Sequence, residues 1–158
     1  MYETKNEILL MDPWMSKEGA FDSSWYQFPP NHDLGDQIRE DIKLSNKEIY
    51  IYISHEHKDH FDVPYLKTLE LSKINFITPK FRRDHVASVL NKLNPKSVTT
   101  PIDSEVLNIG NMEIRLFLDD QEIVRDSALG LIDKEKDFTF LNLNDCKVYD
   151  RVDELKDI

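Results

Sequence analysis

Apolar residues in the first two-thirds of the chain follow two spacings, one typical of buried strands and one typical of helices. Short runs rich in aliphatic, β-branched and aromatic residues predict strands at 7–12, 48–54 and 75–78. Apolar positions that recur every three or four residues predict helices over 34–43, over 63–72 and directly after residue 84. Aspartates occupy the expected N-cap positions of these helices: Asp33, Asp62 and Asp84.

The spacing changes in the last third of the chain. Successive strands are predicted for the segments SVTT, EVLNI, MEIRLFL, SALGLI and FTFLNL, with polar turns between them. This part therefore predicts a β-meander that follows a β-α-β-α-β-α order, with the aromatic segment 13–32 as an ordered loop. Together the two parts predict an α/β fold and one domain over 1–158.

Composition and charge narrow the class of protein. The net charge is −10, whereas nucleic-acid binders usually carry a basic patch. The longest basic grouping, Lys80 with Arg82 and Arg83, is better explained as a solvated loop, so no nucleic-acid partner is expected. No apolar run approaches the ~20 residues of a membrane helix, and the polar start MYETKNE does not resemble a secretory signal. We therefore expect a cytoplasmic protein without a membrane contact.

A cluster of metal-binding residue types follows the strand 48–54. His55, His57, Asp59 and His60 stand within six positions, although the whole chain has only 5 histidines. Residues two apart in an extended segment point the same way, so His55 and His57 are predicted to share one cation. Asp59 and His60 fall on the following turn, where they could hold a second cation. Imidazole and carboxylate suit zinc, manganese or iron, and we expect one or two divalent ions, with zinc favoured.

The remaining reactive and aromatic side chains have ordinary structural explanations. The aromatic residues of 13–32 are expected to pack under a long loop, with the lining of a substrate mouth as the alternative. The single cysteine excludes a disulfide framework. No chemical role is assigned to His32, Ser54, His85, Ser127 and Cys146.

The spacing His-x-His-x-Asp-His after a strand is the signature of the metallo-β-lactamase superfamily. Three stretches, LLMDPWMSKEGAFDSSWYQFPP, IYISHEHKDHFDVPYLKTL and RDSALGLIDKEKDFTFLNLNDC, resemble the β-lactamase-like domain of CMP-N-acetylneuraminate hydroxylases. The resemblance implies a metallo-β-lactamase-like αββα sandwich, here incomplete, with the first half and the β-meander present. It also implies a truncated chain without a Rieske domain, because a Rieske centre needs two cysteines and two histidines.

The resemblance also implies roles for individual residues. His55 and His57 match the ligands of the first metal, and Asp59 and His60 match those of the second. Asp59 would in addition act as the catalytic residue, orienting a metal-bound water and accepting its proton.

Three further aspartates enter through the resemblance alone. Asp145 matches a carboxylate that bridges the two metals. Asp126 stands where many hydrolases of the superfamily have a third histidine for the first metal. Asp12 matches a strand-end aspartate that supports the loop of the histidine cluster, residues 55–60, without binding the metal. We call this loop the metal loop.

The favoured function is metal-dependent hydrolysis, in which metal-bound hydroxide attacks an ester, a lactone or a phosphodiester. The substrate would be a small molecule such as a nucleotide sugar or a phosphoester. Two alternatives stay open: a Rieske-less metal- and substrate-binding component of a CMP-sialic-acid-hydroxylase-like nucleotide-sugar system, and a metal-binding fragment without catalysis. Because an incomplete sandwich exposes an apolar sheet face, a homodimer or a partner chain is expected.

Overall fold

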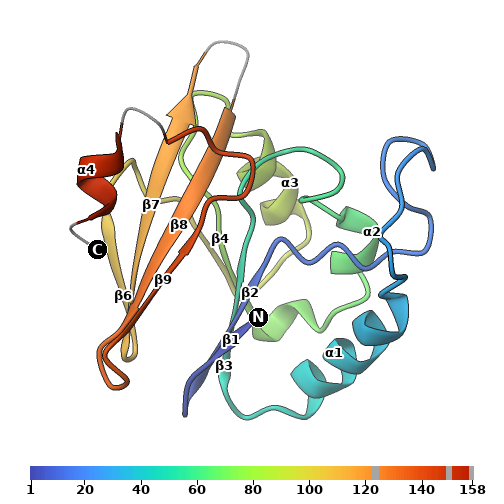
Figure 1. Ribbon diagram of the computed structural model, residues 1–158. Coiled ribbons are helices and arrows are strands. Elements are labelled where there is room, and N and C mark those ends of the chain that lie inside the picture. The colour runs from blue at the N-terminus through green and yellow to red at the C-terminus, as the bar shows by residue number, and fades with distance from the viewer. Residues whose placement is uncertain (122–124, 149–150, 157–158) are drawn as a thin grey trace.

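The computed structural model describes residues 1–121, 125–148 and 151–156, which form two facing β-sheets (Figure 1). The first sheet has the order β1-β2-β3-β4-β5. Its strands are β1 (Tyr2–Glu3), β2 (Glu7–Met11), β3 (Glu48–Tyr52), β4 (Ile74–Ile77) and β5 (Ser97–Thr99). Strand β1 is antiparallel to β2, and the other pairs are parallel.

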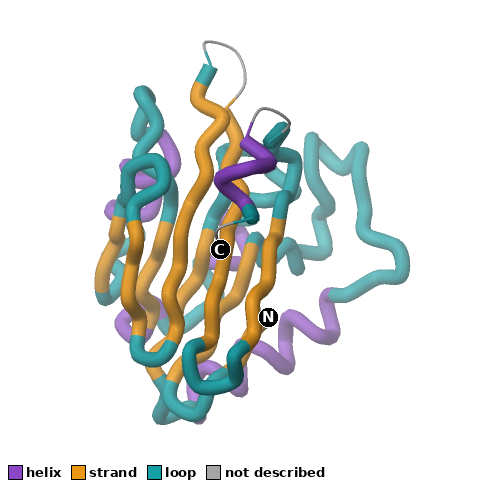
Figure 2. The backbone as a smooth tube through the Cα atoms, turned by 60° about the vertical axis from the view of Figure 1, so that its left-hand side comes forward, coloured by secondary structure: helices purple, strands orange, loops and turns teal. Residues whose placement is uncertain are grey.

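Helices lie in the connections between the parallel strands, as parallel pairing requires. They are α1 (His32–Leu44), α2 (Val63–Leu66), the 3-10 turn η1 (Leu71–Lys73) and α3 (His85–Lys92). All of them cover the face of the first sheet that points away from the second sheet (Figure 1). The connection between β2 and α1 extends beyond the sheets as a long loop (Figure 2). None of the helices in the described ranges is both long and apolar enough to cross a bilayer.

The second sheet is an antiparallel meander of four strands in the order β6-β7-β8-β9. Its strands are β6 (Val106–Ile109), β7 (Met112–Asp120), β8 (Arg125–Asp133) and β9 (Phe138–Asn142), and a short helix α4 (Val152–Leu155) follows them. The predicted meander is thus confirmed for these four strands. The prediction was wrong for SVTT, which pairs in parallel with β4 in the first sheet. The reason is the preceding α3, which returns the chain to the sheet that it left.

Alternating side chains of the first sheet fill two separate cores. Leu9 on β2 and Tyr52 on β3 face the second sheet, where Leu129 of β8 is among their partners. Their neighbours in the sequence, Leu10 on β2 and Ile51 on β3, point the opposite way and face the helices. Because both faces of β2 are covered, its sequence EILLM is almost continuously apolar instead of alternating.

Two predicted helices have different bounds in the structure. Helix α1 begins at His32, so Asn31 is its N-cap and Asp33 lies in its first turn. The helix predicted over 63–72 ends at Leu66. The Thr68 hydroxyl donates a hydrogen bond of 2.8 Å to the carbonyl of Tyr65, and such a side-chain bond competes with the helical ladder. The α/β class itself is confirmed, with one mixed sheet and one antiparallel sheet.

Candidate metal centre

The histidine cluster forms a tight turn at the carboxyl end of β3. Ser54 and His55 are buried, with 0% and 1% of their surface exposed. The backbone then folds back on itself, because the amides of His60 and Phe61 both donate to the carbonyl of His57, at 3.0 and 2.7 Å. This turn returns His60 to His55, and the two imidazole centroids lie 4.3 Å apart.

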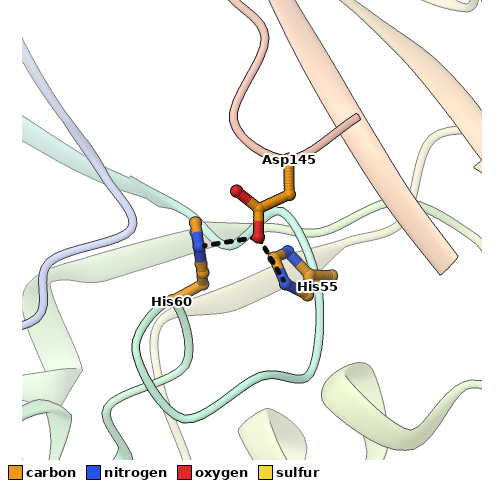
Figure 3. A group of neighbouring side chains, drawn as sticks. All are labelled: His55, His60 and Asp145. Atoms are coloured by element: carbon orange, nitrogen blue, oxygen red, sulfur yellow. Dashed lines mark ion pairs between the residues drawn. The ribbon is translucent and has the colours of Figure 1, made fainter. Parts of the chain in front are cut away.

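A carboxylate from the second sheet completes the group. Asp145 follows β9, and its carboxylate points between the two imidazoles (Figure 3). Asp145 Oδ2 lies 3.5 Å from His60 Nε2 and 4.0 Å from His55 Nε2. One donor atom from each of these three residues falls within 4.8 Å of the others, a grouping that could hold a metal ion. Two imidazoles and one carboxylate therefore converge from distant parts of the chain.

The other two residues of the cluster lie beside this group. His57 Nδ1 is 2.8 Å from His55 Nε2, which agrees with the predicted approach of these two side chains. Asp59 Oδ2 is 3.8 Å from His60 Nε2. Its second oxygen, Oδ1, is buried and accepts no hydrogen bond from the residues that the structure describes. A buried carboxylate oxygen without a donor is unfavourable unless a cation or a water satisfies it.

Asp12 holds the metal loop from the β2 side. It follows β2 with a positive φ of 42° and accepts from the Ser54 amide at 2.7 Å and from the Ser54 hydroxyl at 2.6 Å. The same carboxylate lies 2.9 Å from His60 Nδ1. Asp12 is thus placed to accept a hydrogen bond from His60 Nδ1, and Nε2 is the nitrogen of that ring that faces Asp145.

Asp126 on β8 lies beside His55, although its buried Oδ1 forms no hydrogen bond with the described residues. Its Oδ1 lies 2.7 Å from His55 Nδ1, whereas the approach to Asp145 and His57 is made by Nε2. The structure thus places Asp126 against the ring nitrogen that the three-residue group does not use.

The charges around His60 create a negative environment. Burial lowers the pKa of His60, but the hydrogen bond to Asp12 and the charges of Asp12, Asp59 and Asp145 act in the opposite direction and raise the pKa overall. Several carboxylates around one imidazole favour a positive charge at this place, which a metal ion also supplies.

Three contacts that hold the site were missed by sequence reasoning. The Ser127 hydroxyl on β8 donates to the Ser54 carbonyl at 2.9 Å, and the Tyr52 hydroxyl lies 2.6 Å from Ser127 Oγ. Arg125 donates to Glu56 at 2.7 Å, which joins the metal loop to β8. These partners belong to different sheets, so no sequence spacing connects them.

The aromatic loop differs from its prediction. Trp25, Tyr26 and Phe28 are exposed, by 58%, 62% and 96%. The sequence predicted that these aromatic side chains pack under the loop, and for these three residues that prediction was wrong. Trp14 and Phe21 are only partly exposed, and the ring of Phe21 meets Trp25 edge-on at 5.2 Å and His57 at 6.2 Å.

The chain is similar in sequence to proteins that are named as putative Rieske iron–sulfur proteins. No family model matches the chain. It is 27% identical over 157 residues to a putative Rieske 2Fe-2S iron–sulfur protein of Mycolicibacterium smegmatis and 29% identical over 157 residues to one of Mycobacterium tuberculosis. Each match covers 95% of this chain and 28% of the relative, so the chain spans little more than a quarter of the length of the curated relatives that it matches.

The fold is also found in a solved oxidative enzyme. The crystal structure of CmlA, a diiron β-hydroxylase from Streptomyces venezuelae, superposes with a TM-score of 0.57, 17% identity and coverage of 84% of this chain and 25% of that chain. A variant of the same enzyme superposes equally well. At this identity the likeness concerns the fold alone.

These relatives correct three expectations from the sequence. The proteins that match are named for a Rieske centre, so the assignment to a truncated, Rieske-less group of CMP-N-acetylneuraminate hydroxylases was wrong. The hydrolase function and the preference for zinc were wrong as well, because the names of the relatives and of the solved neighbour concern iron and hydroxylation. Imidazole and carboxylate ligands serve both metals, so residue types alone could not separate zinc from iron.

Proposed function

We propose that this chain forms the iron-binding domain of an oxidative system that receives electrons from a Rieske centre. The observation that carries the proposal is the convergence of His55, His60 and Asp145. Two histidines and one carboxylate with open positions are the ligand set of non-haem Fe(II) oxygenases. The names of the relatives add support, since they point to Rieske-type electron transfer.

The Rieske centre itself would be held outside these 158 residues. Such a centre takes two cysteines and two histidines, and the sequence has one cysteine, Cys146. The donor is therefore another part of a longer protein or a partner chain. The acidic chain, with a net charge of −10, would attract a partner domain that presents basic residues.

The residues present fit iron. His55 Nε2, His60 Nε2 and Asp145 Oδ2 would hold a first ion, and the unpaired buried Oδ1 of Asp59 indicates a place for a cation beside them. His57 and Asp59 would contribute to a second ion, with Asp126 as a further candidate ligand. When bound, iron supplies the one-electron and O₂ chemistry that amino-acid side chains lack.

The chain's own residues prepare this centre before any metal arrives. Asp12 would accept a hydrogen bond from His60 Nδ1, which would leave the lone pair of Nε2 for a metal ion. Asp126 Oδ1 and Ser54 Oγ lie 2.7 and 2.9 Å from Nδ1 of His55, so Nε2 is the nitrogen of that ring that faces Asp145. Burial of His55 and the bonds from Ser54 to Asp12 keep both rings in place, which lowers the conformational cost of binding.

We also propose that the two layers are one half of a metallo-β-lactamase-like sandwich. The layer order, helices on one sheet and that sheet on a second, is what one half of a metallo-β-lactamase-like sandwich would contain. We infer one domain over 1–158, because the residues between the two sheets form one continuous apolar core. A small-molecule substrate and a homodimer or partner chain are part of the same proposal.

The test is iron content after anaerobic reconstitution with Fe(II) and desalting, measured by elemental mass spectrometry. Zinc must be absent, because it binds most nitrogen and oxygen sites more tightly than Fe(II). We expect one or two iron ions per wild-type chain and less than one in His60→Ala and Asp145→Asn. The matched control is His32→Ala, which removes a histidine far from the cluster and should keep the wild-type iron content. Iron-free wild type, or equal iron in His60→Ala and wild type, would refute the proposal.

A further inference from the structure

A cavity of about 430 Å³ opens beside the metal loop. Its wall combines the segment 16–23 with Glu56 and Lys58, and residues of α2 and α3 complete it. The apolar residues that line it are Phe21, Phe61, Val63, Pro64 and Val89. Its size falls within the range of small-molecule sites, which are mostly apolar with a few polar groups at the mouth.

One wall of this cavity has an uncommon backbone. Phe21, Asp22 and Ser23 have positive φ angles of 51°, 56° and 66°, and Gly19 has 72°. A Cβ atom on Gly19 would lie 2.4 Å from the Trp25 carbonyl oxygen, so glycine is required there. Consecutive left-handed residues other than glycine cost conformational energy, persist only where other contacts hold them, and gather at ligand clamps.

The strained segment connects the cavity to the metal loop. The backbone pairs Ala20 with Trp25 and thereby directs Phe21 between Trp25 and His57, at centroid distances of 5.2 and 6.2 Å. The ring of Phe21 is thus both a cavity wall and a neighbour of the candidate metal ligand His57. A molecule in the cavity would be separated from His57 by the ring of Phe21.

The charged and titratable groups that line the cavity include the cation Lys58 and the imidazole of His85, and one carboxylate among them has no ion-pair partner in the described residues. Asp22 accepts from Lys58 at 3.1 Å, and Glu56 accepts from Arg125 at 2.7 Å. Asp62 is buried and accepts three backbone amides. Within the described part of the chain, Glu18 forms no ion pair.

From this arrangement we propose that the cavity binds a small primary amine with an apolar group. The apolar group would lie on Phe61, Val63 and Val89, and the ammonium group would meet Glu18 at the mouth. The acidic net charge of the chain favours a cation over an anion. As the substrate pocket of the metal centre, the cavity rests on the function proposed above; as an amine-binding site it does not.

The experiment is an NMR titration of the ¹⁵N-labelled full chain with 2-phenylethylamine. The matched probe is 3-phenylpropionate, which has the same ring and a similar length but the opposite charge. We expect the amine to shift the amide signals of residues 16–23 and of the start of α3, and to bind more tightly than the carboxylate. Higher salt should weaken the binding, since the mouth is exposed.

Two variants locate the site. Glu18→Gln keeps the shape of the side chain and should raise the Kd of the amine about two- to fivefold, the usual range for an exposed ion pair. Val89→Trp fills the cavity and should abolish the shifts, with a folded spectrum as the condition for using it. Shifts that map elsewhere, equal binding of the carboxylate, or an unchanged Kd in Glu18→Gln would each overturn the proposal.

The titration is carried out with and without added Fe(II). If the chain binds no iron but binds the amine at residues 16–23, the metal proposal fails and the pocket stands. If it binds iron but the amine shifts no signal in the cavity, the pocket fails and the metal proposal stands.

Discussion

Replacing Asp12 with asparagine tests how the metal loop is held. The Asp12 carboxylate accepts from the Ser54 amide at 2.7 Å and the Ser54 hydroxyl at 2.6 Å, and it lies 2.9 Å from His60 Nδ1. Asparagine keeps one oxygen, which can still accept from the Ser54 amide, but it brings an NH₂ group towards His60 Nδ1 and the hydroxyl. One or two hydrogen bonds to a charged group are therefore lost.

The magnitude follows from these contacts. Hydrogen bonds to a charged group contribute about 1.5–3 kcal/mol each, so the loss of one or two of them in Asp12→Asn should destabilise the fold by about 1.5–6 kcal/mol. For a chain of this size that corresponds to a fall in Tm of roughly 3–24 °C. Because the partner that orients a metal-binding histidine usually affects affinity by about 10- to 100-fold, the Kd for Fe(II) should rise by that factor.

The assay pairs calorimetry with an Fe(II) competition titration, and Asp133→Asn is the control. Asp133 is also buried and hydrogen-bonded, to the Tyr2 hydroxyl at 2.7 Å, but it lies at the far end of β8. The control should lose stability and keep its iron affinity. If Asp12→Asn weakened iron binding no more than Asp133→Asn did, the reasoning about the metal loop would be refuted.

Two further predictions concern the core and the cysteine. Leu129→Ala removes a fully buried side chain between the two sheets and should lower the free energy of unfolding, measured by urea titration, by about 2–5 kcal/mol. The control Leu44→Ala, at a position that is 77% exposed, should change the free energy of unfolding little. Equal losses in the two variants would contradict the core described here. Burial, together with the charges of Asp126 and Asp119, raises the pKa of the Cys146 thiol from 9.0 to about 11, so iodoacetamide should alkylate the metal-free native chain at pH 8 roughly 100-fold more slowly than the urea-unfolded chain. Since the folded state keeps this proton longer, stability should fall as pH rises from 9 to 11, and Cys146→Ala should lack that loss; rapid alkylation of the native chain would disprove both statements.

Local sequence patterns predicted most of the elements and the approach of two histidines of the candidate site. Strand β3 and the turn that follows it are encoded within a few residues, so the approach of His55 and His57 was predictable from spacing. The position of α3 was likewise predictable, because the apolar periodicity of a helix is a local pattern. Contacts between elements were harder to predict from the sequence, and Asp145 was named as a candidate ligand only through a family resemblance.

What could not be predicted depends on the packing of the two sheets or on molecules beyond the chain. The contact of Asp145 with His60 requires the second sheet to face the first. The shortness of α2 depends on one hydroxyl of Thr68 that bonds to the backbone. The distinction between hydrolysis and oxidation lies in the metal and in the source of electrons, and His–carboxylate ligands are compatible with either reaction.

The candidate ligands come from both sheets, and this has a consequence for folding. His55 and His60 follow β3, whereas Asp145 follows β9. An ion bound by all three would cross-link the sheets at one end, and its binding would favour the folded over the unfolded chain by mass action. At an Fe(II) concentration about 100 times the Kd, that linkage contributes about 2.7 kcal/mol. The loop that carries Asp145 would then exchange its amide hydrogens more slowly with metal than without it, so the occupancy of the centre would be readable as a change in local unfolding at the end of β9.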